Sequence, residues 1–300
     1  METHWIAVDW GTTNLRAYAM SSEHQILSDA QSHDGAGKLS PDEFEGALLK
    51  LIDDWLVPDR ITSILVCGMA GAKQGWAEAP YLQTPCLPSS SEGLKAVETK
   101  DSRLKVSILP GVCQQSPADV MRGEETQLAG LIADTSSKFN TVCLPGTHSK
   151  WVQLQDNQIH RFNTYMTGET FELLSKQSIL RHELISEGWN QSAFLEAVEE
   201  SLKNPQQLLS DCFRIRAQGL LGKPDSASAR ARLSGLLIGA ELAGAKSYWN
   251  NQNTALIGDD RLVTLYAEAL THIGGNSEIF SAQDMTLQGL IQVYKNLFNQ

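Results

Sequence analysis

The 300-residue sequence lacks the features of several specialised classes of protein. Its five cysteines are an odd number and contain no Cys-x-x-Cys pair, so we expect neither a disulfide framework nor a zinc cluster. Acidic residues number 35 against 24 Lys and Arg, which gives a formal net charge of −11, and no block of five basic residues occurs. A protein that holds nucleic acid or an anionic membrane surface needs clustered positive charge. We therefore expect no such partner.

Long hydrophobic runs are also missing. No stretch approaches 18 uncharged apolar residues, and residues 1–5 are neither cationic nor followed by a long apolar run. This pattern predicts a cytoplasmic protein without a membrane segment. The chain is 42% hydrophobic and 20% charged, an ordinary globular composition, and its length suggests two domains.

The first half of the chain predicts strands interrupted by one helix. The predicted strands are short, apolar and β-branched segments at 5–8, 15–20, 25–28, 61–67 and 104–109. The first three are joined by short polar turns, which favours an antiparallel meander. An amphipathic helix is predicted over 44–56, because Ser40 stands three residues before Glu43 and Pro41 occupies the first helical position. The predicted order is βββαβ.

The second half repeats part of this order. Strands are predicted at 141–144, 151–154, 159–163 and 255–257, and helical sequence at 192–248, 261–273 and 284–298. Gly11-Thr12 and Gly146-Thr147 each lie in the first hairpin of their half, which indicates an internal duplication. We place the division near residue 115, giving domains 1–114 and 115–300, with the last helix a candidate to pack back on the first domain. The small residues of 235–245 favour close helix packing.

The first predicted hairpin has the composition of a phosphate-binding turn. Asp9 ends a buried strand, and Gly11, Thr12 and Thr13 occupy the turn that follows. Glycine allows phosphate oxygens to approach main-chain N–H groups, and the threonines add hydroxyl donors. Asp9 is a candidate to hold Mg²⁺ or its waters, since this ion prefers oxygen ligands. The alternative is a tight hairpin with a capping aspartate.

The second predicted hairpin offers the same chemistry through Gly146, Thr147 and His148. Two such hairpins facing across a cleft could clamp one polyphosphate. Taken alone, His148 is more often a structural or surface histidine, and Lys150 is more often a surface charge.

Paired acids open an apolar helical stretch between the two hairpins. Either Glu124 or Glu125 could act as a general base, accepting the proton of an attacking hydroxyl during phosphoryl transfer. The alternative is that both acids merely favour the helix dipole.

The segment 68–81 follows a central strand and contains a cation, an amide and two aromatic residues. Such a loop suits recognition of a small polar ligand, although an irregular connector has a similar composition. Lys73, Arg16 and Arg122 are the cations best placed to bind a carboxylate on that ligand. The sequence does not choose among them.

The repeated βββαβ order with two Gly-Thr hairpins resembles the sugar kinase, hexokinase and actin superfamily. Four segments, 68–76, 122–127, 144–151 and 162–169, resemble the 2-dehydro-3-deoxygalactonokinase family more closely, and the similarity covers nearly the whole chain. The resemblance implies an α/β fold of two ribonuclease H-like (actin/hexokinase-type) domains. Each would have a mixed sheet flanked by helices, with a cleft between the domains.

That family implies ATP-dependent phosphorylation of 2-dehydro-3-deoxy-D-galactonate to its 6-phosphate in D-galactonate breakdown, with ATP and Mg²⁺ as cofactors. By resemblance, Asp9 matches the metal-side acid and the two hairpins match the phosphate-binding turns, although Leu144 stands where a second acid would map. Glu124 falls where related kinases place the catalytic acid, usually Asp, and Glu125 is the competing assignment. Gly258 is the candidate adenosine contact, in a segment with one glycine where the superfamily has two.

The resulting candidate substrate contacts are polar or aromatic side chains near these motifs: Arg16, Lys73, Gln74, Trp76, Arg122 and Lys150. Two alternatives stay open, namely a kinase of another small sugar or sugar acid, and a non-catalytic ligand-sensing or ATPase module on the same fold. The presence of Asp9 together with Glu124 favours an enzyme. The expected partners are ATP and a sugar acid, with a possible homodimer. Because both ligands are anions, binding to a chain of net charge −11 must depend on local donors and cations.

Overall fold

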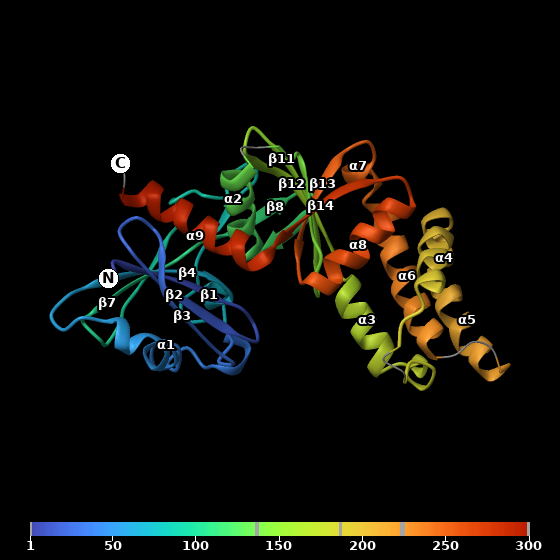
Figure 1. The fold of residues 1–300 in the computed structure, drawn as a ribbon, viewed down its shortest axis with the longest axis horizontal. Helices are drawn as coiled ribbons and strands as arrows, with labels where there is room; N and C mark the ends of the chain where they lie inside the picture. The colour runs from blue at the N-terminus through green and yellow to red at the C-terminus, as the bar shows by residue number, and fades with distance from the viewer. Residues whose placement is uncertain (1, 136–137, 186–187, 223–225, 299–300) are drawn as a thin grey trace. The chain divides into compact units, whose positions relative to one another are not determined.

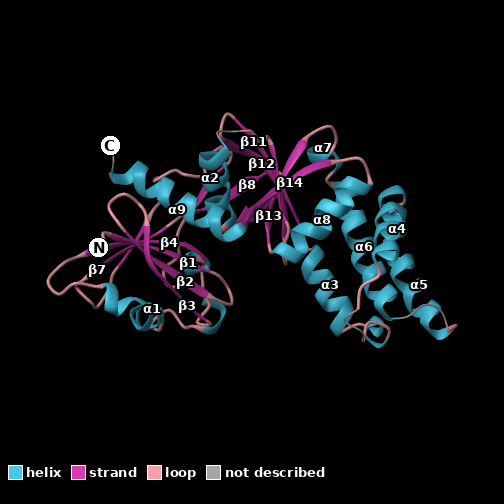
Figure 2. Cartoon of the chain, viewed as in Figure 1, coloured by secondary structure: helices cyan, strands magenta, loops and turns pink. Residues whose placement is uncertain are grey.

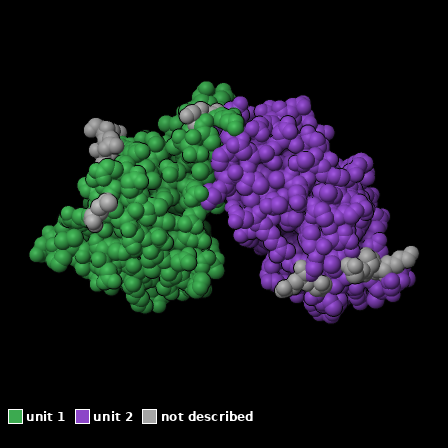
Figure 3. Space-filling view, viewed as in Figure 1, with its two compact units in different colours: residues 1–138, 155–161, 282–300 green, residues 139–154, 162–281 purple. Residues whose placement is uncertain are grey.

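The computed structural model describes residues 2–135, 138–185, 188–222 and 226–298 (Figure 1). These residues divide into two compact units, coloured separately in Figure 3. The first unit comprises Met1–Lys138, Gln155–Arg161 and Ala282–Gln300, and the second comprises Phe139–Leu154 and Phe162–Ser281. Each unit has its own main sheet.

The main sheet of the first unit has six strands in the order β3-β2-β1-β4-β7-β6. Their bounds are Trp5–Trp10 (β1), Leu15–Met20 (β2), Ile26–Ser32 (β3), Thr62–Gly68 (β4), Lys95–Val97 (β6) and Leu104–Ile108 (β7). β1, β2 and β3 form the predicted antiparallel meander, β4 pairs parallel with β1, and β7 pairs parallel with β4. The predicted βββαβ order is confirmed, with α1 (Phe44–Ile52) between β3 and β4.

Both faces of this sheet are covered, because alternate residues of β1 point to opposite sides. Ile6, Val8 and Trp10 pack with the apolar side chains of α1. Trp5 and Ala7 pack with those of α9 (Ala282–Phe298). The last helix therefore belongs to the first unit.

Helix α2 (Glu124–Thr135) lies beside α9 (Figure 1). A β carbon on Gly130 would collide with the carbonyl oxygen of Met285, and one on Gly289 would collide with that of Thr126. The two glycines therefore allow the helices to approach closely. This contact fixes the helix that begins with the two candidate acids.

A small three-stranded sheet, not predicted from the sequence, precedes α2. It has the order β5-β8-β9, with bounds Tyr81–Gln83, Gly111–Gln115 and Ala118–Met121. The predicted division at residue 114 falls inside β8, whereas the first compact unit continues to Lys138. The difference has a physical cause, since β8 pairs with both β5 and β9 and α2 packs on α9.

The main sheet of the second unit has the order β12-β11-β10-β13-β14. Its strands are Thr141–Leu144 (β10), Ser149–Gln155 (β11), Gln158–Tyr165 (β12), Asn253–Gly258 (β13) and Asn276–Ser281 (β14). Figure 2 draws the strands of both units in magenta. β10 pairs antiparallel with β11 and parallel with β13, as β1 does with β2 and β4. The predicted duplication is therefore confirmed in the topology, and residues 145–148 occupy the turn that corresponds to residues 11–14.

The remaining helices of the second unit are α3 (Thr167–Lys176), α4 (Gln191–Lys203), α5 (Leu208–Leu220), α6 (Ser226–Gly244), α7 (Lys246–Trp249) and α8 (Asp260–His272). Short 3₁₀ helices lie at Ala36–Lys38, Asp53–Trp55, Met69–Gly71, Ile179–His182 and Pro205–Gln207. Gly235 and Gly239 of α6 lie against the main chain of α4, as the small-residue stretch predicts. In the described part of the chain, no helix has the length and apolar character that crossing a membrane requires.

Candidate active site

Asp9 lies near the end of β1, directly across from Arg16 in the β1–β2 ladder. Arg16 Nη1 is 3.4 Å from Asp9 Oδ2, and about a quarter of the Asp9 side chain is exposed (24%). Burial raises the pKa of the Asp9 carboxyl, and the charge of Arg16 opposes that shift. Asp9 is therefore a partly accessible acid at the end of a buried strand.

Residues 35–37, which the sequence did not single out, hold the turn after Asp9 in place. The main-chain N–H of Ala36 donates to Gly11 O and that of Gly37 donates to Thr12 O, both at 2.9 Å. A β carbon on Gly35 would collide with the main chain of Thr12 and Thr13. The side chains of Thr12 and Thr13 are exposed. The turn is thus fixed while its hydroxyl groups stay available to a ligand.

The two candidate acids of α2 have different surroundings. Glu124 is partly exposed, and its Oε2 accepts the main-chain N–H of Arg122 at 3.0 Å. Glu125 is buried, with 2% of its surface exposed, and it accepts the N–H of Gly123 with both carboxylate oxygens. Burial, and then the charge of Glu124, raise the pKa of Glu125 to about 8. Only Glu124 has the exposure that direct contact with a ligand requires.

Cys67 connects Asp9 with the beginning of α2. Its Sγ is 4.0 Å from Asp9 Oδ1. Burial raises the pKa of this thiol well above its usual value, and the charges of Asp9 and Glu125 raise it further. Two of the predicted acids therefore lie near one buried, protonated thiol. The only signal for this role in the sequence is the position of Cys67 at the end of a predicted strand.

Arg122 ties the beginning of α2 to the 68–81 segment. Its Nη2 donates to Ala79 O at 2.8 Å, and its Cζ lies 4.4 Å from the centre of the Tyr81 ring. A β carbon on Gly71 would lie 2.7 Å from Arg122 Nη1. In the described part of the chain, Nε and Nη1 of Arg122 are buried without a hydrogen-bond partner. The guanidinium is packed under the loop, where it supports the loop rather than extending into solvent.

The side chains of this loop separate into ligand-accessible and packed groups. Lys73 and Gln74 are exposed. Trp76 is half-buried, with ring centres 5.8 Å from Trp10 and 6.1 Å from Phe44. Trp76 therefore anchors the loop to the core of the first unit, while Lys73 and Gln74 can reach a ligand.

In the second unit, the beginning of α3 lies against the second hairpin. The N–H of Glu169 donates to Thr147 O at 2.9 Å, and His148 Nε2 lies 2.6 Å from Glu169 Oε2. A β carbon on Gly168 would be 2.8 Å from Thr147 Cα and would collide with the carbonyl oxygen of Gly146. Thr147 and His148 are exposed. A helix N-terminus and a glycine turn, both favourable for phosphate oxygens, thus meet here.

Lys150 and Gly258 lie on either side of this hairpin. Lys150 is buried, with 5% of its surface exposed, and its Nζ is 3.3 Å from His148 O. A β carbon on Gly258, at the end of β13, would be 3.0 Å from Pro145 O. The next residue, Asp259, caps α8 by accepting the N–H groups of Arg261 and Leu262.

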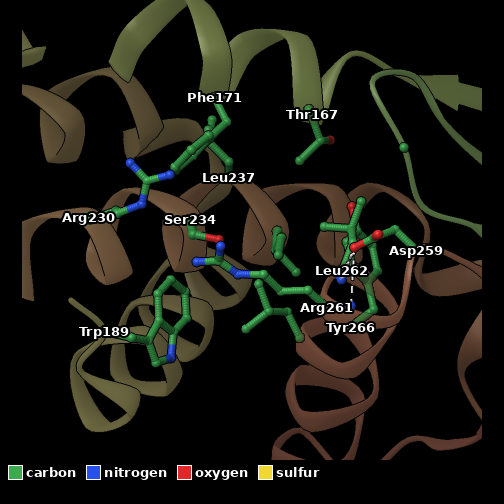
Figure 4. Close-up of a pocket in the computed structure, with 14 residues that line it drawn as sticks. Thr167, Phe171, Trp189, Arg230, Ser234, Leu237, Asp259, Arg261, Leu262 and Tyr266 are labelled. Atoms are coloured by element: carbon green, nitrogen blue, oxygen red, sulfur yellow. Dashed lines mark hydrogen bonds between the residues drawn. The ribbon is translucent and has the colours of Figure 1, made fainter. Parts of the chain in front are cut away.

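A pocket of about 660 Å³, including the part open to solvent, adjoins the hairpin and lies within the second unit (Figure 4). Gly146 and Gly168 line one side of it, and Trp189 and Phe171 provide aromatic surface. The Cζ of Arg230 lies 5.2 Å from the centre of the Phe171 ring. This size and apolar character suit a cofactor or other small molecule. The aromatic and arginine residues carry no motif, so sequence reasoning missed them.

The predicted site residues thus form two groups. The structure gathers Asp9, Gly11–Thr13, Arg16, the 68–81 loop and Arg122–Glu125 in the first unit. It gathers Gly146–His148, Lys150 and Gly258 in the second unit.

The donor set around Asp9 fits a magnesium ion that is bound mainly by water and phosphate. Among the described residues, no group of three or more His, Cys, Asp or Glu side chains could hold a metal ion. Mg²⁺ commonly uses only one or two carboxylates and keeps several waters. A single partly exposed carboxylate beside a turn with exposed threonine hydroxyls meets that requirement.

Comparison with known proteins places this geometry in a family. The sequence model of the 2-keto-3-deoxy-galactonokinase family matches residues 9–293. The chain is similar to a probable 2-dehydro-3-deoxygalactonokinase of Rhizobium meliloti (strain 1021), with 37% identity over 96% of this chain and 95% of that protein. It is also similar to the 2-dehydro-3-deoxygalactonokinase of Escherichia coli (strain K12), with 36% identity over 91% of each chain.

A solved structure is similar over almost the whole chain. The crystal structure of a Sinorhizobium meliloti protein, provisionally assigned as a 2-dehydro-3-deoxygalactonokinase, matches with a TM-score of 0.90 and 34% identity. The match covers 99% of this chain and 100% of that one. With a family match over nearly all of its length, the chain belongs to the 2-keto-3-deoxy-galactonokinase family.

Proposed function

We propose that this protein is an ATP-dependent carbohydrate kinase that phosphorylates 2-dehydro-3-deoxy-D-galactonate to its 6-phosphate in D-galactonate breakdown. Family membership and the names of its relatives support this activity. The observation that carries it is Glu124, a partly exposed carboxylate at the first position of α2, in the same unit as Asp9. A kinase acting on an alcohol needs such an acid.

Glu124 acts as the general base. A carboxylate is too weak to remove a proton from an alcohol in the ground state, but it accepts the proton as the hydroxyl oxygen bonds to phosphorus. Its Oε2 is oriented by the N–H of Arg122. Glu125 is buried behind it and holds the turn at Gly123.

The nucleotide binds through the second unit. Main-chain N–H groups of Gly146–His148 and the N-terminus of α3 bind phosphate oxygens, and the neighbouring pocket holds the adenosine (Figure 4). Arg230 and Arg261 line that pocket, where planar guanidinium groups can stack on a base. Because Gly258 has no β carbon, the main chain at the end of β13 can lie close to Pro145 of the hairpin.

Residues 11–13 form the phosphate-binding turn of the first unit, and Asp9 beside them holds Mg²⁺ through oxygen or bound water. The ion, when bound, neutralises charge on the phosphates during transfer. Asp9 and Arg16 also keep each other in place across the strand pair.

The sugar acid contacts the first unit. Lys73, Gln74 and Arg16 are the accessible polar side chains for its carboxylate and hydroxyl groups. Arg122 and Trp76 hold the loop that carries Lys73, and the buried Lys150 supports the hairpin of the second unit.

A coupled ADP-release assay over a panel of sugar acids tests this function. We expect turnover with 2-dehydro-3-deoxygalactonate well above the ATPase background. Turnover with a different sugar or sugar acid alone would support the second kinase candidate. Binding without turnover would support a non-catalytic module, and either result would overturn the proposed activity.

A homodimer and a cytoplasmic location stay predictions. Molar mass from light scattering on the purified chain tests the first, and fractionation of cells that express it tests the second.

A further inference from the structure

A buried carboxylate lies beneath the proposed nucleotide site. Glu241 of α6 has 3% of its surface exposed. Its Oε1 accepts the indole N–H of Trp151 at 2.8 Å, and its Oε2 accepts the hydroxyl of Tyr266 at 2.7 Å. The hydroxyl of Thr167 also donates to Oε2. Glu241 is not among the site residues predicted from the sequence.

The chemistry of this position is unusual for the middle of a packed helix. Neighbouring α6 residues such as Leu237, Ile238 and Leu242 are apolar and buried. Burial raises the pKa of Glu241, whereas the hydrogen bonds from Thr167, Trp151 and Tyr266 oppose that shift. A buried carboxylate is strongly unfavourable unless its oxygens are satisfied. The surrounding donors provide that satisfaction.

These donors come from three different elements around the nucleotide site. Trp151 lies on β11, the strand that follows the second hairpin. Thr167 is the first residue of α3, directly before Gly168, which lies against Gly146. Tyr266 lies on α8, the helix capped by Asp259, and its hydroxyl is also 3.0 Å from Ser149 Oγ. One carboxylate therefore joins β11, α3 and α8 beside the hairpin.

Thr167 shows why this network concerns the site and not only the core. Thr167 is partly exposed and lines the pocket, yet its hydroxyl donates a hydrogen bond to the buried Glu241. The bond fixes the first turn of α3, where the N–H of Glu169 donates to Thr147 O of the hairpin. A small rotation of α3 would change the gap between Gly168 and Gly146.

We propose that Glu241 is a positioning residue for ATP: through Thr167 and Tyr266 it holds the first turn of α3 and the N-terminal half of α8 at the separation that the nucleotide requires. This inference rests on the proposed binding of ATP in the second unit. Glu241 itself does not touch the ligand.

The test compares two isosteric deletions of a hydroxyl group. Thr167→Val removes a donor to Glu241. Thr141→Val is the matched control, because Thr141 Oγ1 donates to Tyr248 O at 2.9 Å in the same unit, at the start of β10 and away from the hairpin. ATP affinity is measured by calorimetric titration with a non-hydrolysable ATP analogue. The melting temperature and the KM for the sugar acid are measured on the same samples.

We expect Thr167→Val to raise the Kd for the ATP analogue at least about fivefold, the effect of losing one oriented hydrogen bond. The KM for the sugar acid and the Kd of Thr141→Val should each change less than about twofold. Thr167→Ser, which keeps the hydroxyl, should restore affinity. Equal Kd values for Thr167→Val and the unaltered protein would overturn the inference.

A double-mutant cycle separates action through Glu241 from direct contact with ATP. Glu241→Gln replaces one carboxylate oxygen by an NH2 group, which cannot accept a hydrogen bond, so the side chain can no longer accept from the Trp151 indole at one end and from the two hydroxyls at the other. We expect Thr167→Val to add little to the effect of Glu241→Gln, since both remove the same link. Additive effects would show that Thr167 acts on ATP without Glu241. If Glu241→Gln does not fold, Tyr266→Phe takes its place in the cycle.

Gly168→Ala distinguishes failure of this inference from failure of the proposed nucleotide site. If Gly168→Ala weakens ATP binding and the Thr167 and Glu241 variants do not, only the positioning role fails. If Gly168→Ala also leaves ATP affinity unchanged, the nucleotide does not bind at this hairpin.

Discussion

Glu125 accepts the main-chain N–H of Gly123 with both of its carboxylate oxygens, at 2.9 and 2.7 Å. Gly123 has a φ of +103°, a conformation that residues with a β carbon rarely adopt. The bond stabilises the turn from which α2 begins, and the adjacent Glu124 is left partly exposed. Two neighbouring acids of the same type therefore have different surroundings: Glu125 holds the turn, and Glu124 remains accessible.

Glu124→Gln should lower kcat at least about a hundredfold, because it removes the proton acceptor and little else. The KM values for both substrates should stay close to those of the unaltered protein. Steady-state kinetics with the coupled assay measures both quantities.

Glu125→Gln is the matched control. Glutamine resembles the protonated carboxyl that a pKa of about 8 implies at neutral pH, and its amide oxygen can still accept from Gly123. The kcat of Glu125→Gln should stay within about tenfold of that of the unaltered protein, which corresponds to a change of about 1.4 kcal/mol in activation free energy. Normal turnover of Glu124→Gln with loss in Glu125→Gln would move the catalytic role to Glu125.

The pKa of Glu125 also predicts how stability depends on pH. Between its usual value of 4.5 and about 8, the folded protein holds a proton that the unfolded chain has released. The unfolded state then binds fewer protons, so the contribution of Glu125 to the free energy of unfolding falls by about 1 kcal/mol per pH unit as pH rises through this range. Below 4.5 and above about 8 this contribution is flat. Denaturant unfolding from pH 5 to 9 measures the slope, which should be smaller in Glu125→Gln; an unchanged slope would contradict the assignment.

Much of the fold could be predicted from the sequence, because its strands carry local signals. The apolar runs of β1, β2 and β4 and the polar turns between them determine the strand order of the first sheet. The repeated Gly-Thr hairpin then indicated the second sheet. β5, β6 and β9 have only three or four residues each, which is too short for alternating apolar and polar residues to predict a strand.

The site could be predicted where a motif marks it and not where packing creates it. Asp9, Glu124 and the two hairpins follow from local sequence. The support given by Gly35, the packed guanidinium of Arg122 and the network of Glu241 depend on residues far apart in the chain. The contact of the Trp76 ring with Trp10 and Phe44 is a further feature that the sequence does not show, and a role of Trp76 in binding the substrate stays a prediction.

Asp9→Asn should raise the Mg²⁺ concentration needed for half-maximal turnover at least about tenfold, since a neutral amide binds the ion more weakly than a carboxylate. The pKa of Asp9 is already raised by burial, so removing its charge should not cost stability at neutral pH. Turnover measured as a function of Mg²⁺ concentration at saturating ATP and sugar acid tests this expectation. The same Mg²⁺ response in both proteins would refute the metal role.

Arg122→Lys and Lys73→Ala distinguish support of the 68–81 loop from the proposed contact with the sugar acid. Lysine cannot keep both the bond to Ala79 O and the flat contact with the Tyr81 ring. Arg122→Lys should therefore lower the melting temperature by several degrees and raise the KM for the sugar acid, since loss of one buried contact costs about 1–3 kcal/mol. Lys73→Ala, on an exposed position, should raise that KM without changing the melting temperature. An unchanged melting temperature in Arg122→Lys would mean that the guanidinium does not support the loop.

Gly168→Ala should raise the KM for ATP at least about tenfold, with a smaller effect on the KM for the sugar acid. No unusual φ is required of Gly168, and alanine favours a helix, so the local preference for α3 would improve. The added methyl group would nevertheless collide with Gly146 O and lie 2.8 Å from Thr147 Cα, which forces α3 away from the hairpin. Gly46→Ala is the matched control, because it lies in α1 with no atom within 4 Å of the new methyl group. It should slightly stabilise the protein and leave both KM values unchanged. If Gly168→Ala behaves like Gly46→Ala, the close approach of α3 to the hairpin has no part in binding ATP.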